Sequence, residues 1–179
     1  MKTGINNLKA RKIKLLLLDV DGVLTDGGLI FSDKGIESKT FNVRDGHGIV
    51  MLLNAGIPTI FITGRKSKAV LYRAKDLSVK EVYQNTFDKV KVLKKILSRY
   101  GLKPENVAYM GDDVTDIPIL KSVGLSATVS DGVAEVKKFV NFISTKKGGR
   151  GAVRELAEFI LKSKKLWDNI VSNVIKKYV

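Results

Sequence analysis

Two aspartates stand one residue apart at the end of an apolar run, and their placement suggests metal chemistry. Residues 16–18 are leucines, and Asp19 and Asp21 follow them just before Gly22. Burying a lone carboxylate at a strand end is costly because the charge loses its hydration. Two neighbouring carboxylates are tolerated when a cation lies between them, and a divalent metal is the usual one. A simple Asp-Gly turn that ends a strand is the alternative interpretation of this segment alone.

A second acidic cluster follows another short apolar segment far along the chain. Residues 108–110 lead through a glycine to Asp112, Asp113 and Asp116. Strand ends from distant segments meet at one edge of a parallel sheet, so we expect Asp112 to lie near Asp19. Carboxylates from two strand ends supply the hard oxygen ligands that suit Mg²⁺. Acidic residues that complement a helix N-terminus are the alternative, and both interpretations hold if Asp113 serves the helix while Asp112 serves the metal.

Two further segments carry groups that fit a phosphate. The apolar residues 59–62 lead to Thr63, Gly64 and Arg65, which offer a hydroxyl, close backbone approach and a guanidinium. Lys89 opens a long amphipathic segment and can supply a point charge to an anion. Each signal is common in isolation. Their order between the two acidic clusters is what favours a shared site.

These four motifs, in chain order, resemble the signature of the haloacid dehalogenase superfamily of phosphatases. Residues 25–28, 41–49 and 148–155 are similar to the small branch without a cap domain that contains the 3-deoxy-D-manno-octulosonate 8-phosphate phosphatases. The similarity extends from about residue 13 to about residue 161. It implies a Mg²⁺-dependent phosphoric monoester hydrolase that forms an aspartyl-phosphate. The implied reaction releases phosphate from this eight-carbon sugar acid during lipopolysaccharide precursor synthesis.

The resemblance implies roles for three aspartates. Asp19 is the expected nucleophile, and Asp21 protonates the leaving sugar hydroxyl before it activates the hydrolytic water. Mg²⁺ is expected to bind the carboxylates of Asp19 and Asp112 and the backbone carbonyl of Asp21. Waters would complete the octahedron.

The remaining motif residues are expected to bind or support the transferring group. Thr63 and the amide of Gly64 would bind phosphoryl oxygens, and Lys89 would neutralise their developing charge. Asp113 and Asp116 would support these groups from behind, one of them by orienting Lys89.

Substrate contacts are expected from one loop and two arginines. We expect a loop just before a helix to line the site; its residues are Asn42, Val43, Arg44, Asp45 and Gly46. Arg44 can pair with a carboxylate through two hydrogen bonds, and Asp45 can accept from sugar hydroxyls. Arg65 and Arg73 match positions that contact substrate in the resembled family, Arg73 across a subunit boundary. A solvated helix face is the alternative for Arg73, and His47 is expected to be non-catalytic.

Alternating apolar strands and amphipathic helices predict an α/β fold with a doubly wound parallel sheet. After a first strand at 13–18, we expect strands at 59–62, 81–83, 107–110, 125–129 and 141–143, and helices at 48–54, 68–77, 89–99, 117–122 and 133–139. A hairpin should project at about 28–41, and residues 152–178 should be helical with a break near Lys164. The motif spacing leaves no room for a cap, so residues 1–179 read as one domain. The resembled family places the Asp19 strand centrally in the sheet.

The hairpin carries apolar residues that its own domain has little means to cover, namely Ile30, Phe31, Ile36 and Phe41. In the resembled family such hairpins meet in a tetramer and shape the entrance to the site. We therefore expect a homotetramer in which Arg150 approaches a neighbour's entrance.

Composition and charge argue against several other classes of protein. The 179 residues include no cysteine, so no disulfide is expected. Residues 1–12 lack the apolar core of a signal peptide, and no apolar run approaches the roughly 20 residues of a membrane span, so the cytoplasm is the expected location. The net charge of +14 comes from scattered lysines without interleaved aromatics. We therefore expect no nucleic-acid or membrane partner, but an electrostatic bias towards a small anionic substrate.

Two alternatives remain open from the sequence. A nine-carbon 2-keto sugar acid 9-phosphate would suit the same scaffold and chemistry. The chain could instead be a non-catalytic assembly or regulatory subunit. The complete set of motif residues argues against the second alternative, because degenerate copies typically lose one member.

Overall fold

A six-stranded parallel sheet forms the centre of the protein, with strand order β5-β4-β1-β6-β7-β8. The computed structural model describes the backbone of residues 2–178 and the side chains of residues 6–173 and Lys176. The strands are β1 (Leu15–Leu18), β4 (Thr59–Ile62), β5 (Glu81–Tyr83), β6 (Val107–Met110), β7 (Leu125–Thr128) and β8 (Phe142–Ile143). Because β1 pairs with both β4 and β6, its carboxyl end lies in the middle of the sheet edge, which confirms the predicted central position.

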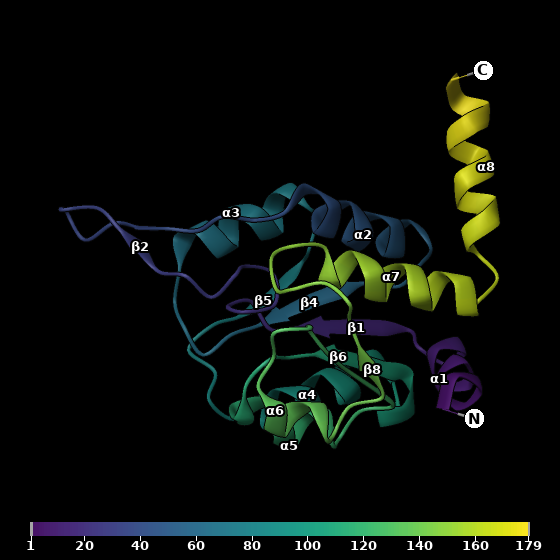
Figure 1. Ribbon diagram of the computed structural model, residues 1–179, viewed down its shortest axis with the longest axis horizontal. Coiled ribbons are helices and arrows are strands. Elements are labelled where there is room, and N and C mark those ends of the chain that lie inside the picture. The colour runs from purple at the N-terminus through teal and green to yellow at the C-terminus, as the bar shows by residue number, and fades with distance from the viewer. Residues whose placement is uncertain (1, 179) are drawn as a thin grey trace.

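Helices cover both faces of this sheet (Figure 1). One face carries α2 (Val43–Asn54), α3 (Lys68–Asp76) and α7 (Ala152–Ser163), and the other carries α4 (Lys89–Tyr100), α5 (Ile117–Leu120) and α6 (Ala134–Lys137). The leucines of β1 alternate between the two layers. Leu16 and Leu18 pack in the first core, and Leu15 and Leu17 in the second. An unbroken apolar strand is therefore what a sheet covered on both faces requires, and the predicted doubly wound fold is confirmed.

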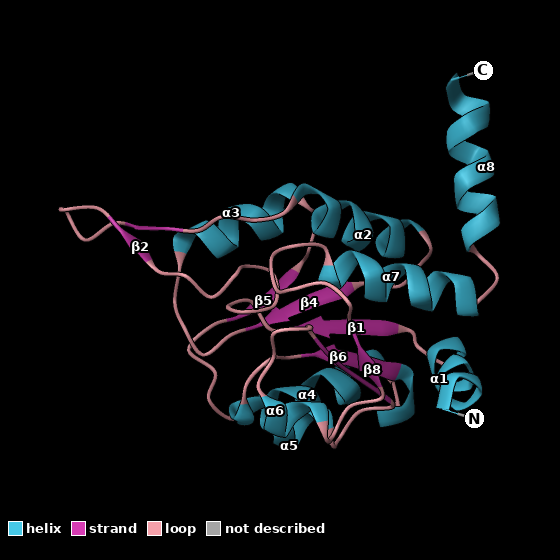
Figure 2. Cartoon of the chain, viewed as in Figure 1, coloured by secondary structure: helices cyan, strands magenta, loops and turns pink. Residues whose placement is uncertain are grey.

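The remaining elements lie at the margins. They are α1 (Lys2–Arg11), the short helices η1 (Pro104–Asn106) and η2 (Val114–Asp116), and α8 (Trp167–Tyr178). The predicted break near Lys164 is confirmed, because α7 ends at Ser163 and Lys165 has a positive φ of 59°. Beyond it α8 points away from the sheet (Figure 2). Within residues 2–178, every helix is too short or too polar to traverse a lipid bilayer.

A small antiparallel hairpin projects from the body between β1 and α2 (Figure 2). Its strands are β2 (Ile30–Phe31) and β3 (Glu37–Ser38), so the paired part is shorter than predicted. Ile30, Phe31 and Ile36 are more than half exposed. Between β1 and β4 the chain forms only this hairpin and α2, which leaves the carboxyl edge of the sheet uncapped.

The first turn of α2 differs from the sequence prediction. The helix begins at Val43, five residues before the predicted start, so residues 43–46 are helical and do not form a loop. Asn42 caps it, since Asn42 Oδ1 accepts the backbone N–H groups of Arg44 at 2.8 Å and Asp45 at 3.4 Å. Glycines within this turn weaken the helical pattern in the sequence. Gly48 has a packing reason: a Cβ there would lie 3.0 Å from the Cα of Arg154 in α7.

Candidate active site

The carboxyl ends of β1, β4 and β6 bring the four motifs to one cavity of about 400 Å³. The cavity is lined by Asp19, Asp21, Thr63, Gly64, Arg65, Thr86, Phe87, Lys89, Asp112, Asp113 and Thr115. Eight of these residues were predicted from the sequence. Thr86, Phe87 and Thr115 were not, because neither their type nor their spacing marks them before the sheet edge is assembled.

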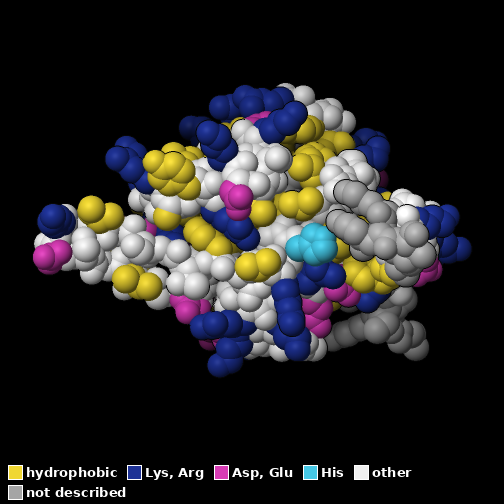
Figure 3. Space-filling view, turned by 90° about the horizontal axis from the view of Figure 1, so that it is seen from above, with side chains coloured by type: hydrophobic (Ala, Val, Ile, Leu, Met, Phe, Trp, Pro, Cys, Tyr) yellow, Lys and Arg dark blue, Asp and Glu magenta, His cyan; other side chains and the backbone are white. Residues whose placement is uncertain are grey.

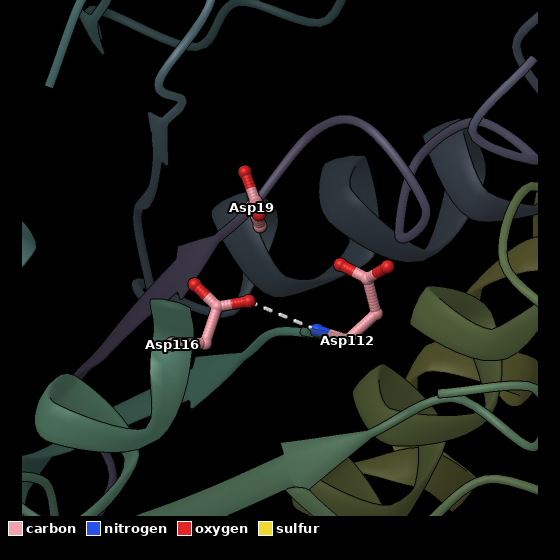
Figure 4. Close-up of side chains that lie close together, drawn as sticks. All are labelled: Asp19, Asp112 and Asp116. Carbon is pink, nitrogen blue, oxygen red and sulfur yellow. Dashed lines mark hydrogen bonds between the residues drawn. The ribbon is translucent and has the colours of Figure 1, made fainter. Parts of the chain in front are cut away.

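Three carboxylates form the acidic centre of this cavity (Figure 4). Oxygens of Asp19, Asp112 and Asp116 all lie within 4.8 Å of one another. Asp116 is fully buried, and its Oδ2 accepts the backbone N–H groups of Asp112 at 3.0 Å and Asp113 at 3.3 Å. Its Oδ1 receives Lys89 Nζ and the Tyr109 hydroxyl, each at 2.6 Å. Both carboxylate oxygens of Asp116 are therefore occupied by internal hydrogen bonds, whereas Asp19 and Asp112 line the cavity.

The Asp112 carboxylate has the properties of a metal ligand. No hydrogen-bond donor among the described residues contacts it, although it lies beside a buried carboxylate. Gly22 packs directly against it, since a Cβ on Gly22 would fall 2.1 Å from Asp112 Oδ2. Burial and the charge of Asp19 raise the pKa of Asp112 to about 7. Uncompensated negative charge on hard oxygens fits a divalent cation such as Mg²⁺.

Lys89 forms ion pairs with both Asp19 and Asp116. It is the first residue of α4, and its Nζ lies 2.8 Å from Asp19 Oδ2 and 3.0 Å from the Tyr109 hydroxyl. Burial alone would lower the pKa of Lys89, but its pairs with Asp19 and Asp116 raise it, so it stays charged. Burial raises the pKa of Asp19 to about 6 against the opposing pull of Lys89. Asp113, by contrast, caps η2 through the N–H of Val114 at 2.7 Å.

Thr63 and Asp21 line the same cavity and contact each other. Thr63 is buried and donates its hydroxyl to Asp21 Oδ2 at 3.4 Å. The same hydroxyl accepts the N–H of Arg65 at 3.1 Å, which forms a tight turn around Gly64 after β4. The other Asp21 oxygen pairs with Lys39 from the hairpin.

An ion-pair chain that the sequence did not reveal joins the hairpin to the cavity. The Lys39 side chain is almost fully buried and contacts both Asp21 and, at 2.9 Å, Glu37 Oε1. Arg65 binds the other Glu37 oxygen at 2.9 Å. Burial opposes ionisation, yet Arg65 and Lys39 lower the pKa of Glu37 to about 2. The available signal was the spacing of Glu37 and Lys39, which puts both on one side of an extended strand.

Comparisons with known proteins agree with this geometry. Residues 78–156 match the family model described as haloacid dehalogenase-like hydrolase. The 3-deoxy-D-manno-octulosonate 8-phosphate phosphatase of Escherichia coli K12 is 43% identical over 153 residues, which cover 86% of this chain and 81% of the relative. The corresponding enzyme of Yersinia pestis is 42% identical over 86% of this chain and 82% of its own. The chain belongs to this phosphatase family.

Solved structures support the same assignment. The family member from Moraxella catarrhalis, solved with a magnesium ion, a phosphate ion and a KDO molecule, superposes with a TM-score of 0.93 at 37% identity, covering 94% of this chain and 97% of that one. A probable phosphatase from Pseudomonas syringae gives a TM-score of 0.94 at 41% identity, covering 96% and 98%.

Residues 42–46 of the present chain are not among the residues that line the cavity, whereas the sequence predicted a loop there that lines it. Asp45 is buried, and its two oxygens accept the N–H groups of Gly151 at 3.0 Å and Arg154 at 2.8 Å. Its carboxylate therefore caps the start of α7 and is not available to sugar hydroxyls within this chain. Arg73 braces the same junction by donating to the Asn42 carbonyl at 3.2 Å and to Asp76 at 2.7 Å.

The raised carboxyl pKa values predict how the metal-free protein responds to pH. Asp19 and Asp112 titrate at about 6 and about 7 when folded, against an ordinary 3.8, so between these values the folded state binds protons that the unfolded chain has released. The contribution of these two carboxyl groups to the free energy of unfolding is therefore fully present at low pH and is lost as pH rises from about 4 to about 8. Thermal unfolding of metal-free protein across this range should show the decline, and Asp112→Asn should flatten it. Equal slopes in both proteins would contradict the assignment.

Proposed function

We propose that this chain is a Mg²⁺-dependent phosphatase that hydrolyses 3-deoxy-D-manno-octulosonate 8-phosphate to the free sugar acid and phosphate, in lipopolysaccharide precursor synthesis. The observation that carries the proposal is the setting of Asp19, a buried carboxylate that lines the cavity between the Lys89 cation and Asp112. Identity of 43% to the Escherichia coli enzyme supports the choice of substrate.

Asp19 would act as the nucleophile that forms an aspartyl-phosphate. Its Oδ1 accepts the N–H of Val20 at 2.7 Å, while its Oδ2 pairs with Lys89, so the carboxylate is held in one orientation. Mg²⁺ bound by the carboxylates of Asp19 and Asp112 and the backbone carbonyl of Asp21 would offset the repulsion between two anions. Asp116 positions Lys89 and the Asp112 backbone rather than the metal.

The transferring phosphoryl group would lie between the ends of β1 and β4. The Thr63 hydroxyl and the Gly64 amide are placed to bind its oxygens, and Lys89 would neutralise the charge that develops on them. Asp21 would give a proton to the leaving sugar oxygen and take one from the water that hydrolyses the aspartyl-phosphate. Lys39 and Thr63 contact the two Asp21 oxygens and so restrict the position of this carboxylate in the cavity.

Recognition of the sugar acid would begin with Arg65. Its guanidinium is partly exposed at the mouth of the cavity and is anchored by Glu37. A guanidinium fixed in this way can pair with the substrate carboxylate through two hydrogen bonds.

Steady-state kinetics with two sugar acid phosphates tests this function directly. The eight-carbon sugar acid 8-phosphate should be hydrolysed with a higher kcat/KM than a nine-carbon 2-keto sugar acid 9-phosphate, and removal of metal should abolish both activities. Mg²⁺ should restore them. A preference for the nine-carbon substrate would replace the proposed one, and the absence of any phosphatase activity would favour the non-catalytic alternative.

We also propose that the protein works as a cytoplasmic homotetramer assembled through its hairpins. The side chains of Ile30, Phe31 and Ile36 are 54%, 55% and 63% exposed, and an interface between copies would cover them. Light scattering should give a mass of four chains, and Phe31→Asp with Ile36→Asp should reduce it. A monomeric wild type would contradict this assembly.

A further inference from the structure

A second cavity, also of about 400 Å³, lies between the first turn of α2, the segment before α7 and the first two turns of α7. Its charged lining consists of Arg44, Lys146, Arg150, Arg154, Glu155 and Glu158. It shares no lining residue with the cavity that contains Asp19. Figure 3 shows Lys and Arg side chains gathered beside the single histidine, His47, whose ring nitrogen lies 3.2 Å from Arg154.

The two glutamates of this cavity are already engaged. Glu158 accepts hydrogen bonds from Arg154 Nε and Lys162 Nζ, each at 2.8 Å. Glu155 accepts from the Ser144 hydroxyl and from both the N–H and the hydroxyl of Thr145. Glu158 is therefore paired with cations, whereas the partners of Glu155 are neutral and it keeps its charge. The four cations of the lining still outnumber its two carboxylates.

The other three cations of the lining, Arg44, Lys146 and Arg150, have few carboxylate partners in the protein. Within the part of the chain that the structure describes, Arg44 and Lys146 have no carboxylate within 4.0 Å. Arg150 reaches Asp26 only at 3.5 Å, and both side chains are at least half exposed, so this pair contributes little. Asp45 lies at the same junction, but its oxygens are taken by the backbone of Gly151 and Arg154.

We propose that this cavity binds a small oxyanion with at least two negative charges, of the phosphate, pyrophosphate or polycarboxylate kind. The guanidinium groups of Arg44 and Arg150 offer paired donors that match such oxygens, and Lys146 adds a point charge. The site shares no lining group with the catalytic cavity, and it gives Arg44 a second anion as its ligand in place of the substrate carboxylate predicted from the sequence.

The site is nevertheless packed against the catalytic loop. Gly149 donates its N–H to the Val23 carbonyl at 2.9 Å. Gly148 approaches so closely that a Cβ would fall 1.9 Å from the Gly22 carbonyl oxygen. An anion held by Arg150 would therefore rest on a segment that touches the loop carrying Asp21.

Calorimetric titration of metal-free protein tests the proposal, with the chelator dialysed away because it is itself a polycarboxylate. Without metal, the four carboxylates that line the catalytic cavity outnumber its two cations, Arg65 and Lys89, so its net negative charge disfavours anion binding there. Inorganic phosphate, pyrophosphate and citrate are titrated in separate arms at low ionic strength. We expect one site per chain for at least one of them, and the preferred anion shows whether the ligand is a phosphate or a carboxylate.

Two double variants that remove the same charge distinguish specific binding in this cavity from non-specific attraction of anions to a basic protein. Arg44→Gln with Lys146→Gln should weaken binding at least tenfold, and both side chains are exposed, so the fold should be retained. Lys91→Gln with Lys94→Gln removes the same charge from the exposed side of α4 and should leave binding unchanged. No binding, binding that survives the first variant, or equal weakening in both variants would overturn the proposal.

Discussion

Replacement of Asp19 with asparagine is expected to lower kcat by about 10⁴-fold or more. An amide is a poor nucleophile towards phosphorus, and it also removes one of the two cavity-facing carboxylates that would hold the metal. The fold should survive, because burial of the Asp19 carboxylate is costly and raises its pKa to about 6. Activity is measured with the sugar phosphate at saturating Mg²⁺, and the fold by circular dichroism and thermal unfolding.

A matched control is Asp33→Asn in the exposed turn of the hairpin, which removes one negative charge at a distance from the cavity. It should retain wild-type kcat. A second readout is specific to the nucleophile: rapid acid quenching should trap phosphate on the wild-type chain and none on Asp19→Asn. Appreciable turnover or a trapped phosphoenzyme in Asp19→Asn would contradict the assignment of Asp19 as the nucleophile.

The catalytic carboxylates could be predicted from the sequence because each follows a locally visible apolar strand, while the central position of the Asp19 strand came from the family resemblance. Four consecutive leucines predict a strand covered on both faces, and parallel strands present their carboxyl ends at one edge. Asp19 and Asp112 could therefore be brought together without coordinates, and the structure places their oxygens within 4.8 Å. The sequence allowed Asp113 to serve a helix N-terminus, which agrees with its cap on η2. Which of Asp113 and Asp116 orients Lys89 stayed open, since both are acidic and only the turn after β6 decides which one turns inward.

The parts that were missed depend on contacts between segments with no local signature. Lys39 resembles a surface lysine until the hairpin folds back and buries its amine beside Asp21. Asp45 looked available to substrate because its partners, the first N–H groups of α7, lie more than a hundred residues away. Helix caps supplied by another element cannot be predicted from a window of sequence, and this limit explains why residues 42–46 were expected to line the cavity.

Replacement of Asp21 with asparagine should produce a loss that depends on the leaving group. General acid catalysis contributes about 10² to 10⁴-fold, and it matters most when the departing oxygen is a poor leaving group. Sugar phosphates and other alkyl phosphates should therefore lose activity by about that factor, while aryl phosphates, whose phenolate leaves unaided, should lose far less in the step that forms the aspartyl-phosphate. The measurement is kcat/KM over a series of phosphate esters that span a wide range of leaving-group pKa.

Lys39→Met is the matched comparison for that series, since it removes the cation bound to one Asp21 oxygen and leaves the Asp21 carboxylate in place. If Asp21 acts by proton transfer, the slope against leaving-group pKa should steepen in Asp21→Asn and stay near the wild-type slope in Lys39→Met, whatever the overall rate. If Asp21 only maintains the ion-pair chain with Glu37 and Arg65, both variants should lower alkyl and aryl phosphate turnover by a common factor. An unchanged slope in Asp21→Asn would therefore assign that carboxylate to the hairpin contact and leave the proton to another donor.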